Sequence, residues 1–202
     1  MNEPIYEPKR TKRIPTQQEM AHVFLFYSFL SAAFLFALVL LKFLMFDQLL
    51  SFARPMHLFL WTAAGSLLMI GYGVLLTVML SSNHIDDANK AYQDGSVASI
   101  AVFMLAASLF EELLFRGLLQ NLLSLWTGNA WSAILLTTVV FVCFHVQYFR
   151  KPVMLVTISL PSVVFGWLYV KTGNLLVPTV VHFTMNFVMT MLFKFNKVAL
   201  RD

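Results

Sequence analysis

Long apolar runs separated by short polar segments extend along most of the chain and predict its architecture. An α-helix that crosses a bilayer needs about 20 mostly apolar residues. Runs of this kind predict membrane spans at residues 21–46, 56–80, 97–126, 130–149, 153–170 and 175–195. The fold class that follows is all-α: a multi-pass integral membrane helical bundle with about six transmembrane helices.

The polar segments between these runs predict the organisation of the chain. Residues 1–20 are polar and basic and predict a flexible cytoplasmic tail, and residues 197–202 predict a second, short tail. Residues 21–96 hold the first two spans and a hydrophilic loop, and residues 97–196 hold the other spans as one helical core. Glycine and asparagine at 127–129 and 171–174 predict tight turns between spans.

The composition supports this assignment and limits the class of partner. Of the 202 residues, 59% are hydrophobic and 12% are charged, whereas soluble domains have about 45–50% apolar and about 25% charged residues. The net charge of +4 is spread over tails and loops, so we expect contact with the lipid bilayer and no nucleic acid. The single cysteine, Cys143, excludes an internal disulfide bond.

Lysine and arginine predict the orientation of the bundle, because they are enriched in cytoplasmic loops. Six spans put both termini on one side, and that side carries ten basic residues against three on the other, with Arg116 embedded. The bias predicts that both termini are cytoplasmic. The ten are Lys9, Arg10, Lys12, Arg13, Lys90, Arg150, Lys151, Lys194, Lys197 and Arg201, and the three are Lys42, Arg54 and Lys171.

Two carboxylates and a guanidinium interrupt the third apolar run, in the segment SLFEELLFRGLLQN at 108–121. An ionisable residue at the centre of a bilayer helix costs at least ~2.5–3.5 kcal/mol. Glu112 and Arg116 are four residues apart, so they share a helix face and predict a structural ion pair. Glu111 points in another direction and has no cationic partner on its own helix. We therefore expect Glu111 to act as a general base that activates water.

The later runs add two histidines and an asparagine. His145 lies in the fourth run, and His182 and Asn186 lie four residues apart in the sixth, on one helix face. Embedded polar side chains face the bundle interior, so we expect these three and Glu111 to converge on one polar cavity. Their depths agree best if the membrane part of the third run is about 104–126. Taken alone, each histidine fits an interhelical hydrogen bond better than a catalytic role, and Asn186 fits either equally. Glu111 favours a functional role, because an unpaired carboxylate in a span has no cheaper explanation.

Such a group suits peptide hydrolysis, with a base for water, an imidazole that assists it and donors for the tetrahedral oxyanion. Alternatively, Glu111, His145 and His182 form a three-ligand zinc site with an open fourth position. The chain has no HExxH motif, so the cofactor stays open between none and Zn²⁺.

Three motifs on successive runs give the chain a family resemblance. They are EELLFR from Glu111 to Arg116, FVCFH from Phe141 to His145, and HFTMN from His182 to Asn186. With the pattern EExxxR, FxxxH and HxxxN, the chain resembles the CPBP family of intramembrane metalloproteases. This family is also called the Abi or CAAX-protease-like family and includes the type II CAAX prenyl endopeptidases. The resemblance covers about residues 97–195.

The resemblance implies an endopeptidase site within the membrane, so that residues 97–196 are the catalytic core. It implies that Glu111 activates water, that His145 assists it, and that His182 and Asn186 stabilise the oxyanion or bind metal. Supporting roles fall to Glu112, Arg116 and Phe141.

The resemblance also limits the substrate. Prokaryotic members are similar to processors of peptide precursors and to bacteriocin immunity factors, so we expect a peptide or membrane-tethered protein substrate in a prokaryotic cell membrane. The alternatives are a non-catalytic immunity or scaffold protein and, less favoured, a transporter. The sequence defines no oligomeric state.

Overall fold

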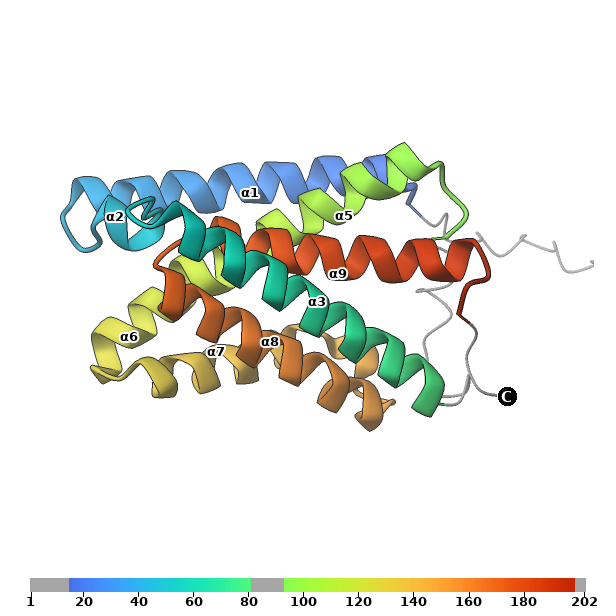
Figure 1. The fold of residues 1–202 in the computed structure, drawn as a ribbon. Helices are drawn as coiled ribbons and strands as arrows, with labels where there is room; N and C mark the ends of the chain where they lie inside the picture. The colour runs from blue at the N-terminus through green and yellow to red at the C-terminus, as the bar shows by residue number, and fades with distance from the viewer. Residues whose placement is uncertain (1–14, 81–92, 199–202) are drawn as a thin grey trace, which may run out of the picture.

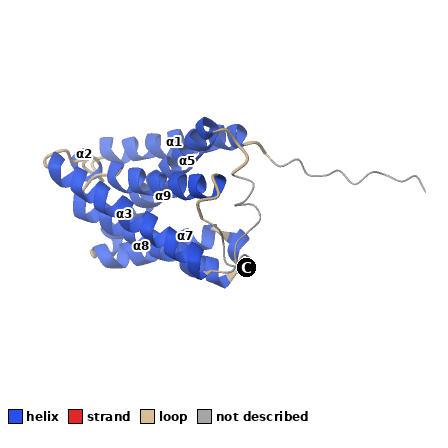
Figure 2. Cartoon of the chain, turned by 45° about the vertical axis from the view of Figure 1, so that its right-hand side comes forward, coloured by secondary structure: helices blue, strands red, loops and turns tan. Residues whose placement is uncertain are grey.

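The protein is described by a computed structural model that covers residues 15–80 and 93–198. Most of the predicted N-terminal tail, the hydrophilic loop at 81–92 and residues 199–202 lie outside these ranges. Within them the chain forms helices joined by loops, and no strand is present (Figure 2).

The helices follow the order of the apolar runs. They are α1 (Gln17–Leu40), α2 (Phe46–Leu49), α3 (Pro55–Met79), α5 (Val97–Glu112), the π-helix η2 (Leu113–Gln120), α6 (Asn121–Thr127), α7 (Ala130–Phe144), the 3₁₀ turn η3 (Val146–Tyr148), α8 (Pro152–Thr172) and α9 (Leu176–Lys194). Five segments of the described part are long and apolar enough to cross a membrane: α1, α3, the continuous segment 97–127, α8 and α9. The α7 helix is apolar but shorter. The predicted all-α membrane fold is confirmed.

The first helix is placed differently from the predicted run at 21–46. It starts at Gln17 because Thr16 and Glu19 form a capping box, in which each side chain accepts the backbone N–H of the other residue, at 3.2 and 2.8 Å. It ends at Leu40, and Lys42 has a φ of 62°. A residue in this left-handed region cannot continue a right-handed helix.

The fourth helix ends earlier than predicted, at Phe144 and not at Phe149. In a continuing helix the N–H of His145 would bond to the carbonyl of Phe141. Here the imidazole Nδ1 of His145 forms a hydrogen bond with that carbonyl oxygen at 2.8 Å. The backbone N–H of His145 donates to Val142 O instead, at 3.0 Å. This exchange ends α7 and leads into η3.

The long helices are arranged in pairs around the segment that carries the two glutamates. In Figure 1, α1 lies along α5, α3 lies along α9, and α7 lies along α8; contacts between the members of each pair support this arrangement. The α5 helix also contacts α9, while η2 contacts α1, α6, α7 and α8. The junction of α5 and η2 is therefore in the bundle interior.

The outward faces of the bundle are apolar, as a lipid-facing surface requires. On α1, Phe29 and Phe36 are exposed, and on α3 Leu67 is exposed. The inward face of α3 has small residues: a Cβ on Gly65 would lie 3.0 Å from Leu168 Cδ1, and one on Gly73 would lie 2.8 Å from Met189 Sδ. These two glycines therefore allow close helix contact.

At one end of the bundle, the linker between α2 and α3 is fastened to the turn between α8 and α9. Ser51 N donates to Gly173 O at 2.9 Å, and Leu175 N donates to Leu49 O at 2.9 Å. The amide Nδ2 of Asn174 donates to Ser51 O at 2.8 Å. Gly173 has a φ of +59°, which a glycine adopts without strain. We call this contact the linker clamp.

Candidate active site

The two adjacent glutamates lie where the backbone changes from α-helix to π-helix. Glu111 and Glu112 are the last residues of α5, and η2 begins at Leu113. Short π-helical segments inside α-helices are frequent at functional sites. The predicted pair between Glu112 and Arg116 forms across this junction, with Arg116 Nη1 3.1 Å from Glu112 Oε1.

His182 on α9 lies between the two carboxylates. Its Nδ1 is 2.8 Å from Glu112 Oε1, and its Nε2 is 3.8 Å from Glu111 Oε2. Because an ionised carboxylate only accepts hydrogen bonds, Nδ1 carries the proton that is donated to Glu112. The ring stacks on Phe165 with centroids 4.7 Å apart and an interplanar angle of 23°. The orientation of His182 is therefore fixed on two sides.

Glu112 and Arg116 are completely buried and belong to a larger polar network. Arg116 Nη2 donates to the carbonyl and the hydroxyl of Ser162 on α8, at 2.8 and 2.9 Å. Ser162 donates in turn to Thr138 Oγ1 on α7 at 3.2 Å. The network joins η2 to α7 and α8, so the position of Glu112 depends on all three elements.

Glu111 is the carboxylate that this network leaves free. Its side chain is 20% exposed, and its Oε2 atom lies 3.8 Å from His182 Nε2. No hydrogen bond to its carboxylate is found within residues 15–80 and 93–198. This agrees with the expectation that Arg116 pairs with Glu112 and leaves Glu111 without a cation on its own helix.

His145 follows α7 and is half-buried. Its ring lies 4.5 Å from the ring of Phe141 and stacks on Tyr148 at 5.9 Å, between centroids. The ring of Phe141 also lies 5.4 Å from the guanidinium carbon of Arg116. Phe141 therefore contacts both His145 and Arg116. In the described part of the chain, no hydrogen bond or ion pair joins His145 to Glu111 or His182.

Asn186 lies one turn after His182 on α9 and is half-buried. Within the described ranges its side-chain amide makes no hydrogen bond to protein. Asn186 and Glu111 are thus two partly exposed polar groups near His182 that retain hydrogen-bonding capacity.

Comparison with known sequences places these residues in a family. The sequence model of the family described as "Type II CAAX prenyl endopeptidase Rce1-like" matches residues 93–188, which include all three motifs. Residues 93–188 are therefore similar to the Rce1-like family, which is a family of endopeptidases. The predicted resemblance is confirmed.

Two bacterial relatives match parts of the chain. The chain is 28% identical over 144 residues to the uncharacterized protein YpbD of Bacillus subtilis (strain 168), a match that covers 64% of this chain and 71% of YpbD. It is 31% identical over 96 residues to an uncharacterized 24.3 kDa protein of Escherichia coli, covering 47% of this chain and 43% of that relative. No solved structure matches the chain.

The zinc alternative requires three ligands that meet at one point. Within residues 15–80 and 93–198, no three histidine, cysteine, aspartate or glutamate side chains are grouped so that they could hold a metal ion. The predicted ligands Glu111, His145 and His182 do not fit a metal as they are arranged here. We therefore derive no catalytic step through a metal, and zinc binding stays a prediction.

Sequence reasoning missed the bond between Glu112 and His182, because no local pattern relates residues 70 positions apart. One signal was present for the buried network: Ser108, Glu112, Arg116 and Gln120 recur at every fourth position, and all four are buried. A polar stripe at helical spacing in an apolar span predicts an interior polar face. This stripe holds the buried polar network around Glu112 and Arg116.

Proposed function

We propose that the protein is an intramembrane endopeptidase in which Glu111 activates a water molecule for attack on a peptide bond. The observation that carries the proposal is the pair formed by Glu111 and His182. Their facing atoms are 3.8 Å apart, too far for a direct hydrogen bond but close enough for one water molecule to contact both. The match to a protease family supports the reaction class.

In the proposed reaction, Glu111 takes a proton from water while the water oxygen bonds to the substrate carbonyl carbon. Asn186 donates a hydrogen bond to the oxyanion from its free amide. The C–N bond then breaks, and Glu111 returns the proton to the leaving amine. Water and one amide are consumed, and a carboxylic acid and an amine are formed.

His182 has a second role in the proposed reaction. Glu112 accepts the Nδ1–H group of His182 at 2.8 Å and keeps the ring in place. The Nε2 atom of His182 then faces Glu111, where it contacts the bridging water. His145, on the other side of Phe141, is a positioning residue in this arrangement.

The proposed substrate is a peptide or a membrane-tethered protein that enters from the bilayer. The lipid-facing helices support an integral membrane location, and the two bacterial relatives support a prokaryotic cell membrane. A non-catalytic scaffold is the competing function, because the network from Glu112 to Thr138 also holds helices together. It leaves unexplained why Glu111 is partly exposed and without a hydrogen bond in the described chain.

The test compares purified wild type with Glu111→Gln in detergent, using a library of prenylated and unprenylated peptides and detecting new termini by mass spectrometry. We expect cleavage to fall by about 10²- to 10⁴-fold, the contribution of a general base. Asp94→Asn is the matched control, because Asp94 is exposed outside the site. Equal cleavage by wild type and Glu111→Gln would exclude this role of Glu111. Loss of activity with a chelator, restored by zinc, would favour the metal alternative.

A further inference from the structure

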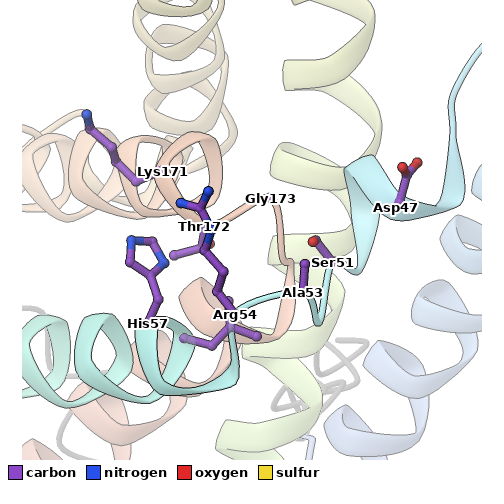
Figure 3. A pocket seen from close by; sticks show the side chains of 9 residues that line it. Asp47, Ser51, Ala53, Arg54, His57, Lys171, Thr172 and Gly173 are labelled. Carbon is purple, nitrogen blue, oxygen red and sulfur yellow. The ribbon is translucent and has the colours of Figure 1, made fainter.

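A second polar site lies at the end of the bundle where α3 begins and α8 ends. It is a pocket of about 370 Å³, lined by Asp47, Ser51, Ala53, Arg54, His57, Leu58, Lys171, Thr172 and Gly173 (Figure 3). We call it the Arg54 pocket. Its volume is within the range of about 300–1,000 Å³ of small-molecule sites. None of these residues belongs to the site at Glu111.

The walls of the Arg54 pocket are held in place by the linker clamp. Ser51 and Gly173, which line the pocket, are joined by the hydrogen bond from Ser51 N to Gly173 O. The wall on α3 is fixed by Trp61, whose Nε1 donates to His57 Nε2 at 2.7 Å. Trp61 packs edge-on against Trp167 of α8, with centroids 5.1 Å apart. Two segments that are distant in sequence thus form one rigid concave surface.

Positive charge gathers on one side of this surface. Arg54 and Lys171 are exposed, and in the described part of the chain neither forms an ion pair. The Lys171 ammonium lies 6.0 Å from the centroid of the Trp167 ring. In Figure 3, Arg54 extends toward Thr172 and His57 lies beside it, whereas the acidic lining residue, Asp47, projects from α2 on the far side.

His57 adds a hydrogen-bond donor to these cations. Trp indole N–H only donates, so His57 Nε2 accepts and the neutral ring carries its proton on Nδ1. No acceptor for Nδ1 is found among the described residues. The pocket therefore presents a guanidinium, an ammonium and an imidazole N–H, which is a donor set for an anion.

The position of the pocket identifies the anion. It lies at the ends of two apolar helices that are long enough to span a membrane, α3 and α8, and it is flanked by two tryptophans, which are enriched at the membrane–water interface. Lipid headgroups supply phosphate at the ends of membrane-spanning helices, and an arginine fork matches phosphate geometry. We propose that the Arg54 pocket binds the phosphate group of an anionic phospholipid.

The test measures lipid binding by the full-length protein in detergent, by native mass spectrometry with phosphatidylglycerol, phosphatidylcholine or inorganic phosphate. Each cation near an anionic surface contributes about a fivefold change in binding. We therefore expect the double variant Arg54→Gln/Lys171→Gln to bind phosphatidylglycerol roughly 25-fold more weakly, and the single variant Lys171→Gln about fivefold more weakly. The Arg54 side chain makes no capping hydrogen bond to α3, so we expect the variants to fold, which circular dichroism checks.

Arg150→Gln/Lys197→Gln is the matched control, because both cations are exposed and lie away from the Arg54 pocket. Arg150 precedes the start of α8, and Lys197 follows the end of α9. It should change phosphatidylglycerol binding by less than twofold. Equal weakening in the two double variants, or equal binding of phosphatidylcholine and phosphatidylglycerol by wild type, would overturn the proposal. Binding of inorganic phosphate that depends on Arg54, with phosphatidylglycerol binding unaffected, would replace the lipid with a soluble ligand. Peptide cleavage is not used in this test, so its result is independent of the proposed protease activity.

Discussion

The buried pair of Glu112 and Arg116 makes a quantitative prediction about stability. In Glu112→Gln the side chain keeps its shape but loses its charge, and Arg116 keeps its charge in a site where it is completely buried. Breaking a buried ion pair from one side costs about 3–5 kcal/mol. Because Ser162 still accepts two hydrogen bonds from the guanidinium, we expect the lower value, about 3 kcal/mol. For a chain of this size that corresponds to a decrease of about 6–12 °C in Tm.

Thermal unfolding in detergent, followed by tryptophan fluorescence, measures this decrease, with Asp94→Asn as the exposed control. A second variant tests the cause: in Glu112→Gln/Arg116→Met the buried charge is removed as well, so the double variant should be more stable than Glu112→Gln alone. A Tm for Glu112→Gln within 1 °C of wild type would refute the view that this pair holds the site together. A double variant less stable than Glu112→Gln would also refute it.

Four further substitutions test local packing, capping and chemistry. Gly71→Ala should stabilise the protein by up to about 1 kcal/mol, because a Cβ there meets nothing within 4 Å. Gly65→Ala should destabilise it by about 1–3 kcal/mol, because a Cβ there lies 3.0 Å from Leu168 Cδ1. Thermal unfolding of both variants shows whether their changes in stability have opposite signs. Thr16→Ala should cost about 1 kcal/mol by removing the helix cap, measured in the same way. Asn186→Ala should lower kcat about 10²- to 10³-fold at unchanged Tm; an unchanged kcat in the peptide assay would exclude Asn186 as an oxyanion donor.

The sequence was sufficient to predict most of the fold because bilayer thickness sets the length of an apolar run. The second, fifth and sixth predicted spans differ from α3, α8 and α9 by one or two residues at each end. The first and fourth spans were extended too far. Their ends depend on a backbone angle at Lys42 and on a side-chain bond from His145, and neither changes the apolar character of the run.

The candidate site was predictable only in part, for a related reason. Helical spacing predicts the contact between Glu112 and Arg116, because both residues lie in one segment. The contacts of His182 depend on how α9 packs against α5, and hydropathy carries no information on that packing. The same holds for Ser162, which replaces water around Arg116 but looks like any serine in an apolar helix.

The linker clamp has a consequence for how the matched segment could be used alone. Residues 93–188 begin after α3, yet α3 packs along α9, and the clamp fixes the turn from which α9 starts. His182 lies on that helix, two turns from its beginning. The α3 helix and the linker clamp therefore help to set the position of the His182 imidazole along α9. We expect residues 93–188, expressed without the preceding helices, to lack the proposed peptidase activity.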